Sequence, residues 1–195
     1  MTEAQTTKDR IAFLRSLRAV RQFRPDPVPQ DVVYDILEVA RWSGSAGNRQ
    51  PWEFVVIRER NTLRGLATVE GYAGHLASAA MGIVPVMAGE RAEQEIYDEG
   101  RLCERIMLAA FAHGVGSSIG WLVGSGVEDA KNLLGIPPER RVRSALSLGY
   151  PKEEVQRARI RPGQARKPLA DLLHEERYGT EARRLRPLWF RGSPV

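Results

Sequence analysis

Residues 43–52 read Ser-Gly-Ser-Ala-Gly-Asn-Arg-Gln-Pro-Trp and combine side-chain types that could bind a flat ligand. Small residues let a backbone approach a ligand closely, amides offer paired donors and acceptors, and an indole ring supplies an apolar surface. The stretch is also more elaborate than a simple reversal of chain direction requires. We therefore interpret residues 43–52 as one half of a binding site.

A second group of residues could carry out nucleophilic chemistry. Residues 116–120 match the G-x-S-x-G pattern around Ser118, and Asp171 and His174 follow in the chain order that such hydrolases use. That pattern needs a strand before the serine and a helix after it, whereas a helical pattern precedes it here. Asp171 and His174 are also three residues apart on one short predicted helix, which does not place the carboxylate behind the imidazole. The sequence therefore disfavours a hydrolase.

Dinucleotide and metal sites are disfavoured as well. Gly114, Gly116 and Gly120 follow a helical pattern rather than a strand, so the sequence does not predict a pyrophosphate site at a strand-to-helix turn. There is also no P-loop pattern. The three histidines are scattered, and the single cysteine, Cys103, stands apart from them, so no metal site is predicted.

Basic residues form two pairs at opposite ends of the sequence, Arg18 with Arg21 and Arg166 with Lys167. The two pairs could converge on one phosphate, while small-residue segments offer backbone N–H groups to a planar head group. Residues 117–122 form a segment of this kind. Spacing alone does not distinguish this arrangement from four solvated surface side chains.

Hydrophobic periodicity predicts the elements that would position these residues. We expect helices over residues 10–18, 31–42, 62–70, 73–80, 93–113, 127–134 and 168–175, and strands over residues 53–57, 82–88 and 142–148. The helix over residues 93–113 should be the central one because its apolar run continues around most of its surface. Pro85 should place its strand at a sheet edge or a bulge. The mixed order of helices and strands disfavours a regular βαβ fold.

Length and composition favour one soluble domain. The chain has 195 residues, of which 43% are hydrophobic, and a net charge of +5. The arginines of the last third could serve an anionic ligand or a basic arm, but most of them should form a solvated face. With one cysteine no intrachain disulfide can form, and Cys103 should be a buried structural thiol. Neither a signal peptide nor a membrane-spanning apolar run is evident, so we expect a cytoplasmic protein without membrane partners.

Several segments in order resemble the flavin-dependent nitroreductase family. They begin with Arg-Ala-Val-Arg-Gln-Phe at residues 18–23 and Ser-Ala-Gly-Asn-Arg-Gln-Pro-Trp-Glu-Phe at residues 45–54. Later matches are Gly-Val-Gly at 114–116, Leu-Gly-Ile-Pro at 134–137, Leu-Gly-Tyr-Pro at 148–151 and Arg-Lys-Pro-Leu at 166–169. The resemblance covers roughly residues 15–179, and the ordered set is more specific than any one segment.

The resemblance implies an α+β fold, a nitroreductase-like α/β/α sandwich with a mostly antiparallel central sheet, and an obligate homodimer with two FMN sites at the interface. The FMN-binding residues that it implies are Arg18, Ala19, Val20, Arg21, Arg166 and Lys167 at the phosphate, Ser45 and Asn48 from the other subunit, Gly120, Trp121 and Leu122 along the flavin ring, and His75 beside it. Three positions depart from the family pattern. Leu17 and Ala19 replace a basic residue and a serine at the phosphate, and Gly44 stands where proline is common, which should loosen the loop.

The function implied by the resemblance is FMN-dependent oxidoreduction without a catalytic side chain. NADH or NADPH would deliver hydride to flavin N5, and a small electron-poor acceptor such as a nitroaromatic or quinone would follow in a ping-pong cycle. Two alternatives stay open: reductive dehalogenation or oxygen-dependent chemistry on the same flavin scaffold, and a non-enzymatic module that binds nucleic acid through basic residues 183–186. We expect one domain over residues 1–182 and an arm over residues 183–195 that docks on the partner subunit.

Overall fold

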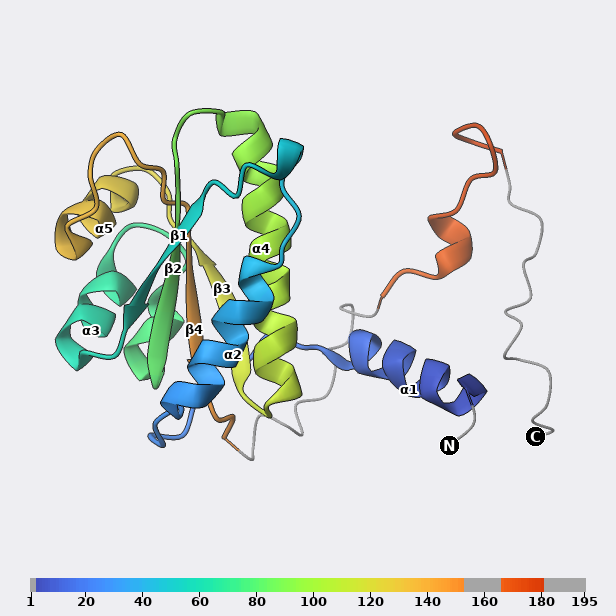
Figure 1. Ribbon diagram of the computed structural model, residues 1–195, viewed down its shortest axis with the longest axis horizontal. Coiled ribbons are helices and arrows are strands. Elements are labelled where there is room, and N and C mark those ends of the chain that lie inside the picture. The colour runs from blue at the N-terminus through green and yellow to red at the C-terminus, as the bar shows by residue number, and fades with distance from the viewer. Residues whose placement is uncertain (1–2, 153–165, 181–195) are drawn as a thin grey trace. The chain divides into compact units, whose positions relative to one another are not determined.

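A computed structural model of the chain describes residues 3–152 and 166–180 (Figure 1). The chain divides into two units, residues 1–157 and residues 158–195. The predicted arm over residues 183–195 lies outside the described residues, so its docking and the domain boundary before it stay predictions. The candidate site is described within the first unit.

Helices and strands alternate irregularly along the first unit. Its α-helices are α1 (Glu3–Ser16), α2 (Gln30–Arg41), α3 (Arg60–Thr68), α4 (Ala92–Ala112) and α5 (Gly126–Leu134). Its strands are β1 (Trp52–Ile57), β2 (Met81–Met87), β3 (Gly116–Trp121) and β4 (Ser144–Gly149), and two short 3₁₀ helices, η1 (Ala46–Asn48) and η2 (Gly74–Ser78), lie in connecting segments.

The four strands form one antiparallel sheet in the order β1-β2-β4-β3. Helices α2 and α4 cover one face, and α3 and α5 cover the other (Figure 1). Ile36 and Ile106 pack with Leu146 on the first face, while Leu63 packs with Val84 on the second. The predicted α+β fold with a mostly antiparallel sheet between helical layers is therefore confirmed.

Periodic apolar positions explain why the main helices form where predicted. Val33, Ile36 and Ala40 line the buried side of α2 at helical spacing. Helix α4 ends before Gly114, whose φ of 70° is a left-handed conformation that glycine adopts without strain. Cys103 is buried in α4 as predicted, and burial raises the pKa of its thiol to about 12.

The expectation that Pro85 marks an edge strand is wrong, because β2 pairs with β1 on one side and β4 on the other. The β4 ladder covers only Met81 to Ile83 of β2, so Pro85 lies beyond its end. Beyond Pro85, Met87 exchanges backbone hydrogen bonds with Arg141 rather than with β1. Because backbone groups alternate sides along a strand, the N–H that Pro85 lacks also lies on this side, away from β1.

Residues 117–122 were predicted only as a small-residue segment, and most of them form β3. Two other expectations need correction. The helix predicted over residues 73–80 is the shorter 3₁₀ helix η2, and the one over residues 168–175 is reduced to the 3₁₀ helix η3 (Leu169–Asp171). His174 therefore does not share a helix with Asp171; its ring lies 4.5 Å from that of Tyr178 instead.

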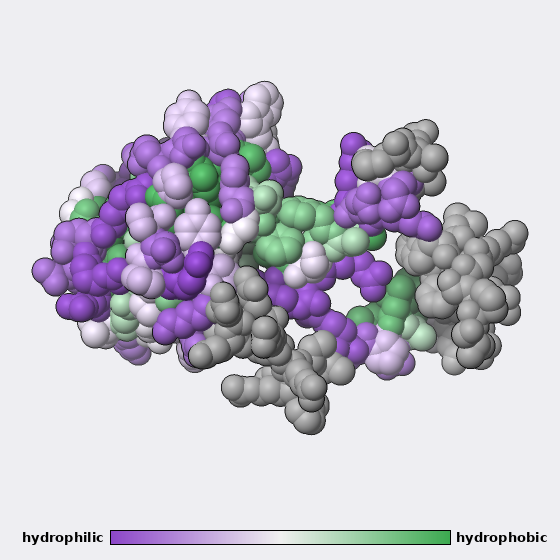
Figure 2. Space-filling view, turned by 90° about the horizontal axis from the view of Figure 1, so that it is seen from below, coloured by the Kyte–Doolittle hydropathy of each residue, from purple (hydrophilic) through white to green (hydrophobic). Residues whose placement is uncertain are grey.

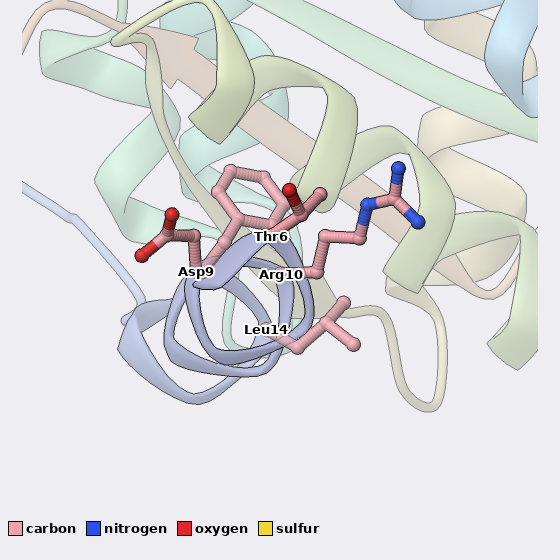
Figure 3. A pocket seen from close by; sticks show the side chains of 5 residues that line it. Thr6, Asp9, Arg10 and Leu14 are labelled. Carbon is pink, nitrogen blue, oxygen red and sulfur yellow. The ribbon is translucent and has the colours of Figure 1, made fainter. Parts of the chain in front are cut away.

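The surface is largely hydrophilic, with apolar side chains reaching it in several places (Figure 2). One shallow pocket is lined by Thr6, Asp9, Arg10, Phe13 and Leu14, all from α1 (Figure 3). The ring of Phe13 lies 5.1 Å from that of Phe111 at the end of α4. This pocket brings together none of the predicted site residues. Among the described residues, no helix is long and apolar enough to cross a membrane.

Candidate cofactor site

The N-terminal basic segment lies against the start of β3. Ala19 forms a parallel bridge with Ser117, and the Val20 N–H donates to the Ser117 carbonyl at 2.8 Å. Gly116 makes this approach possible, because a Cβ there would lie 2.8 Å from the Val20 Cβ. Two predicted parts of the site, residues 18–21 and the segment at the start of β3, are thus brought together.

The other end of β3 is covered by residues 71–73. The Tyr72 N–H donates to the Trp121 carbonyl at 2.7 Å, and Gly71 forms an antiparallel bridge with Leu122. Gly120 lies against Ala73 so closely that a Cβ on Gly120 would be 2.7 Å from the Ala73 Cα. Glycine at position 120 therefore lets the backbones of β3 and residues 72–73 meet.

Between these two covering segments, Ile119 lies on the outer edge of β3, where the His75 side chain approaches its backbone. β3 is the last strand of the sheet, and the carbonyls of Ser117 and Trp121 point outward to Val20 and Tyr72. Ile119 is two residues from each, so its backbone groups point to the same edge. No backbone hydrogen bond of the described residues is formed there. The Ile119 N–H can therefore donate to an acceptor on a ligand.

Three exposed apolar side chains line the sheet face beside this edge, and we refer to Tyr72, Ile119 and Trp121 as the β3 shelf. The antiparallel bridge places Tyr72 opposite Trp121, and Ile119 shares their face because side chains alternate along a strand. Their exposed fractions are 75%, 39% and 57%, respectively. Large apolar side chains held by paired backbone in this way can pack against a planar ring. Sequence reasoning identified Trp121 but missed Tyr72 and Ile119, because the strand pairing of residues 71–73 was not recognised.

His75 lies near the same edge. Its Nδ1 is 2.7 Å from the Ser147 Oγ of β4, while its Nε2 is buried and has no hydrogen-bond partner. Burial lowers the pKa of His75, and the positive charge of Arg21 lowers it further. The structure therefore brings His75 close to Arg21 and keeps the imidazole neutral at physiological pH.

Unsatisfied polar atoms gather around β3. Among the described residues, the buried side-chain polar atoms without a partner include Ser117 Oγ, Ser118 Oγ and His75 Nε2. A buried polar group without a hydrogen bond costs about 1–3 kcal/mol, so groups of this kind favour a bound polar molecule. Of these groups, the Ser117 hydroxyl shares the sheet face of the β3 shelf, and together with the Ile119 N–H it offers a combination that suits a flavin. No group of three potential metal ligands occurs in the described part of the chain.

The basic residues of the predicted phosphate site are exposed. The Arg18 Nη1 donates to the carbonyls of Arg15 and Leu17, at 2.7 Å in both cases, and so caps the end of α1. A guanidinium has five N–H donors, so Arg18 retains others for an anion. Arg166 and Lys167 are exposed in the second unit, whose placement relative to the first is not determined. Their convergence with Arg18 and Arg21 stays a prediction.

The loop of residues 43–50 has a defined but strained backbone. Ser45 Oγ accepts a hydrogen bond from the Gln50 N–H at 2.8 Å, which closes the loop. Asn48 and Gln50 have φ values of 54° and 50°, left-handed conformations that cost energy for residues with side chains. Both side chains are exposed. A strained loop that presents an exposed amide is typical of a contact site rather than of a simple connection.

The loop and the β3 edge lie toward opposite ends of α4 (Figure 1). The loop contacts the N-terminal half, where Gly44 meets Arg101. Ala46, Arg49 and Pro51 line a small cavity together with Asp98. Ser117 follows the C-terminal end of α4 at Ala112. At 1.5 Å per residue, roughly 20 Å of helix separates Asp98 from that end. One chain therefore does not bring Ser45 and Asn48 to Arg18 and Arg21.

Comparison with known proteins gives consistent matches. Residues 14–98 match the model of the nitroreductase family. A relative from Archaeoglobus fulgidus, provisionally named NADH dehydrogenase/NAD(P)H nitroreductase, is 33% identical over 152 residues, which cover 74% of this chain and 86% of the relative.

Solved structures agree with this match. A nitroreductase from Clostridium difficile R20291, described as FMN-dependent, superposes with a TM-score of 0.77 at 22% identity, covering 86% of this chain and 99% of that one. A provisionally named nitroreductase from Desulfovibrio desulfuricans, solved in complex with FMN, superposes with a TM-score of 0.71 at 26% identity, covering 86% of this chain and 96% of that one.

Proposed function

This chain belongs to the nitroreductase family, and from that premise we propose that it is an FMN-dependent oxidoreductase that uses NADH or NADPH to reduce a small electron-poor molecule such as a nitroaromatic or a quinone. The names of its relatives and the FMN complex of a solved homologue support this proposal. The single observation that carries it is the outer edge of β3 at Ile119, where a backbone N–H without a backbone partner among the described residues lies beside an apolar shelf.

Each group at this edge has a distinct role in binding. The β3 shelf packs against one face of the flavin ring, and the Ile119 N–H donates to an acceptor at the ring edge. Arg18 and Arg21 hold the phosphate by charge-assisted hydrogen bonds. When bound, FMN supplies hydride transfer at N5, so the protein needs no catalytic side chain of its own.

The functional unit we propose is a homodimer in which the loop of residues 43–50 completes the site of the partner subunit. In support, the loop lies toward the far end of α4 from the β3 edge of its own chain, and its strained Asn48 presents an exposed side chain. An isologous dimer would use this loop twice, once for each flavin. The loop would then be a cofactor contact and a reason to dimerise.

The visible absorption spectrum of the purified protein tests the proposal. We expect a flavin spectrum, either as isolated or after addition of FMN, that bleaches under anaerobic conditions with NADH or NADPH and returns when a quinone or nitroaromatic is added. Colourless protein that takes up no FMN would contradict the proposal. If such protein bound nucleic acid with a steep salt dependence, a basic binding module would be the better interpretation.

A further inference from the structure

Arg101 of α4 occupies the space beside Gly44. A Cβ built on Gly44 would overlap the Arg101 Nη2 and lie 3.2 Å from its Cζ. Gly44 is not among the residues with positive φ, so its backbone does not itself demand glycine. What position 44 requires is room for the guanidinium. The expectation that Gly44 merely loosens the loop therefore leaves out the group that fills this space.

The same guanidinium is tied to α4 on its other side. Arg101 Nη1 lies 3.7 Å from the Asp98 Oδ1, and the Asp98 side chain is only 6% exposed. Asp98 in turn faces the loop across a small cavity that Ala46 and Pro51 also line. The Arg101 side chain, which is 57% exposed, therefore lies between a buried carboxylate of the helix and Gly44 of the loop.

The loop needs external support because its own backbone is strained. Asn48 and Gln50 hold left-handed conformations, which asparagine tolerates more readily than glutamine. At Gln50 the conformation costs on the order of 1–3 kcal/mol, which the surrounding contacts must offset. Two further contacts fasten its later part: Arg49 Nη2 lies 2.9 Å from Glu90 Oε2, and the Pro51 carbonyl accepts the Ala88 N–H at 2.9 Å. At the start of the loop, the Arg101 guanidinium packs against Gly44, without a hydrogen bond or ion pair to the loop among the described residues.

We propose that Arg101 is a positioning residue, which sets the orientation of residues 43–50 so that Ser45 and Asn48 reach the flavin site of the second subunit. This inference rests on the proposed function. A proline at position 44 would restrict the loop backbone directly, whereas here Arg101 of α4 restricts it by packing against Gly44. Gly44 and Arg101 then act as one unit, and changing either member should have the same effect.

Four variants test this coupling: Arg101→Ala, Gly44→Ala, the double variant, and Arg105→Ala as a control. Arg105 is an exposed arginine one turn further along α4, so its removal causes the same change in charge. The methyl group of Gly44→Ala displaces only the end of a flexible side chain, so it should act by dislodging Arg101. We expect each single variant to raise the Kd for FMN by roughly three- to tenfold and the double variant to raise it no further. The control should stay within about twofold of the wild type.

A second measurement does not depend on flavin. In the FMN-free protein, hydrogen exchange at residues 43–50 should be faster in Arg101→Ala and Gly44→Ala than in the control, while the global Tm is unchanged. Unchanged exchange, or single effects that multiply in the double variant, would overturn the inference. If the wild type takes up no FMN, the proposed function fails, and the exchange measurement alone decides whether Arg101 positions the loop.

Discussion

A mixed dimer can reveal which subunit supplies the loop to each flavin site. One subunit would carry Arg21→Ala, which removes a predicted phosphate contact. The other would carry Ser45→Ala with Asn48→Gly, which removes the predicted loop contacts. Glycine at position 48 tolerates the φ of 54° that Asn48 adopts, so this change removes the amide without adding backbone strain. Arg21 is exposed, and its side chain has no hydrogen bond or ion pair among the described residues, so the fold should not depend on it.

The expected magnitude follows from the kind of contact removed. A hydrogen bond to a charged group contributes about 1.5–3 kcal/mol, so Arg21→Ala should weaken FMN binding by roughly ten- to a hundredfold. The loop variant loses two neutral hydrogen bonds of about 1 kcal/mol each, so its affinity for FMN should fall roughly tenfold or more. In the mixed dimer, a loop that crosses to the partner leaves one site with both lesions and one site with none. About half of the sites should then bind FMN with the wild-type Kd.

The assay is an FMN titration of mixed dimers isolated through two different affinity tags, followed by flavin fluorescence. The titration should be biphasic, with a tight phase of half the wild-type amplitude and about half the wild-type turnover with NADH or NADPH. Dimers that carry Arg21→Ala in both subunits serve as the control and should show no tight phase. A mixed dimer without a tight site would refute the reasoning, because a loop that serves its own chain leaves one lesion in every site.

Three further predictions concern the body of the fold. Burial raises the pKa of Glu99 above its unfolded value of 4.5, so the folded protein binds the carboxyl proton more tightly than the unfolded chain does. The stability that the protonated carboxyl contributes is complete below pH 4.5 and is lost as the pH rises through the folded pKa. Glu99→Gln should therefore raise the Tm more at about pH 8 than at about pH 5, by roughly 2–4 °C if the buried charge costs about 1 kcal/mol, whereas the exposed Glu104→Gln should not. Gly120→Ala should lower both the Tm and the uptake of FMN because the new Cβ meets the Ala73 backbone. The control Gly100→Ala, whose Cβ meets nothing within 4 Å, should lower neither. Equal effects of the two variants would contradict the close contact between Gly120 and Ala73. Cys103 is buried and its pKa is about 12, so it should react with a thiol reagent only as fast as the protein opens. Fast labelling of the folded protein would contradict the burial of this thiol.

The sequence predicts the elements whose signals are local. Helix α2 appears within one residue of the predicted bounds because three apolar positions at helical spacing define its buried face. Strand β3 was not predicted as a strand, since Gly-Ser-Ser-Ile-Gly-Trp has little of the β-branched alternation typical of strands. Pairing with β4 and the cover given by residues 19–20 and 71–72 make it one. These partners are distant in sequence, so no local pattern reveals them.

Buried carboxylates are a second feature that periodicity does not reveal. Glu95, Asp98 and Glu99 lie on the buried side of α4, where a helical pattern predicts apolar residues. Glu95 is retained there because its carboxylate accepts the N–H groups of residues 89–91 and lies 3.4 Å from Arg141. Residues 89–91 precede α4 in the sequence, and Arg141 follows it. Only the fold brings both of them to the Glu95 carboxylate.

Departures from local rules occur at several places in the described part of the first unit, among them Glu99 and Arg141, and two of these places contain predicted site residues. Buried Ser117, Ser118 and His75 leave polar atoms unsatisfied around β3, whereas Asn48 and Gln50 strain the loop on the N-terminal half of α4. Natural chains break such rules mainly where function requires it, because each violation must be offset by stability gained elsewhere. Asparagine adopts a left-handed conformation in ordinary turns, so Gln50 is the less usual of the two left-handed residues in this connection. In the proposed dimer, the loop of one copy would meet the β3 edge of the other, so that both places would belong to one flavin site.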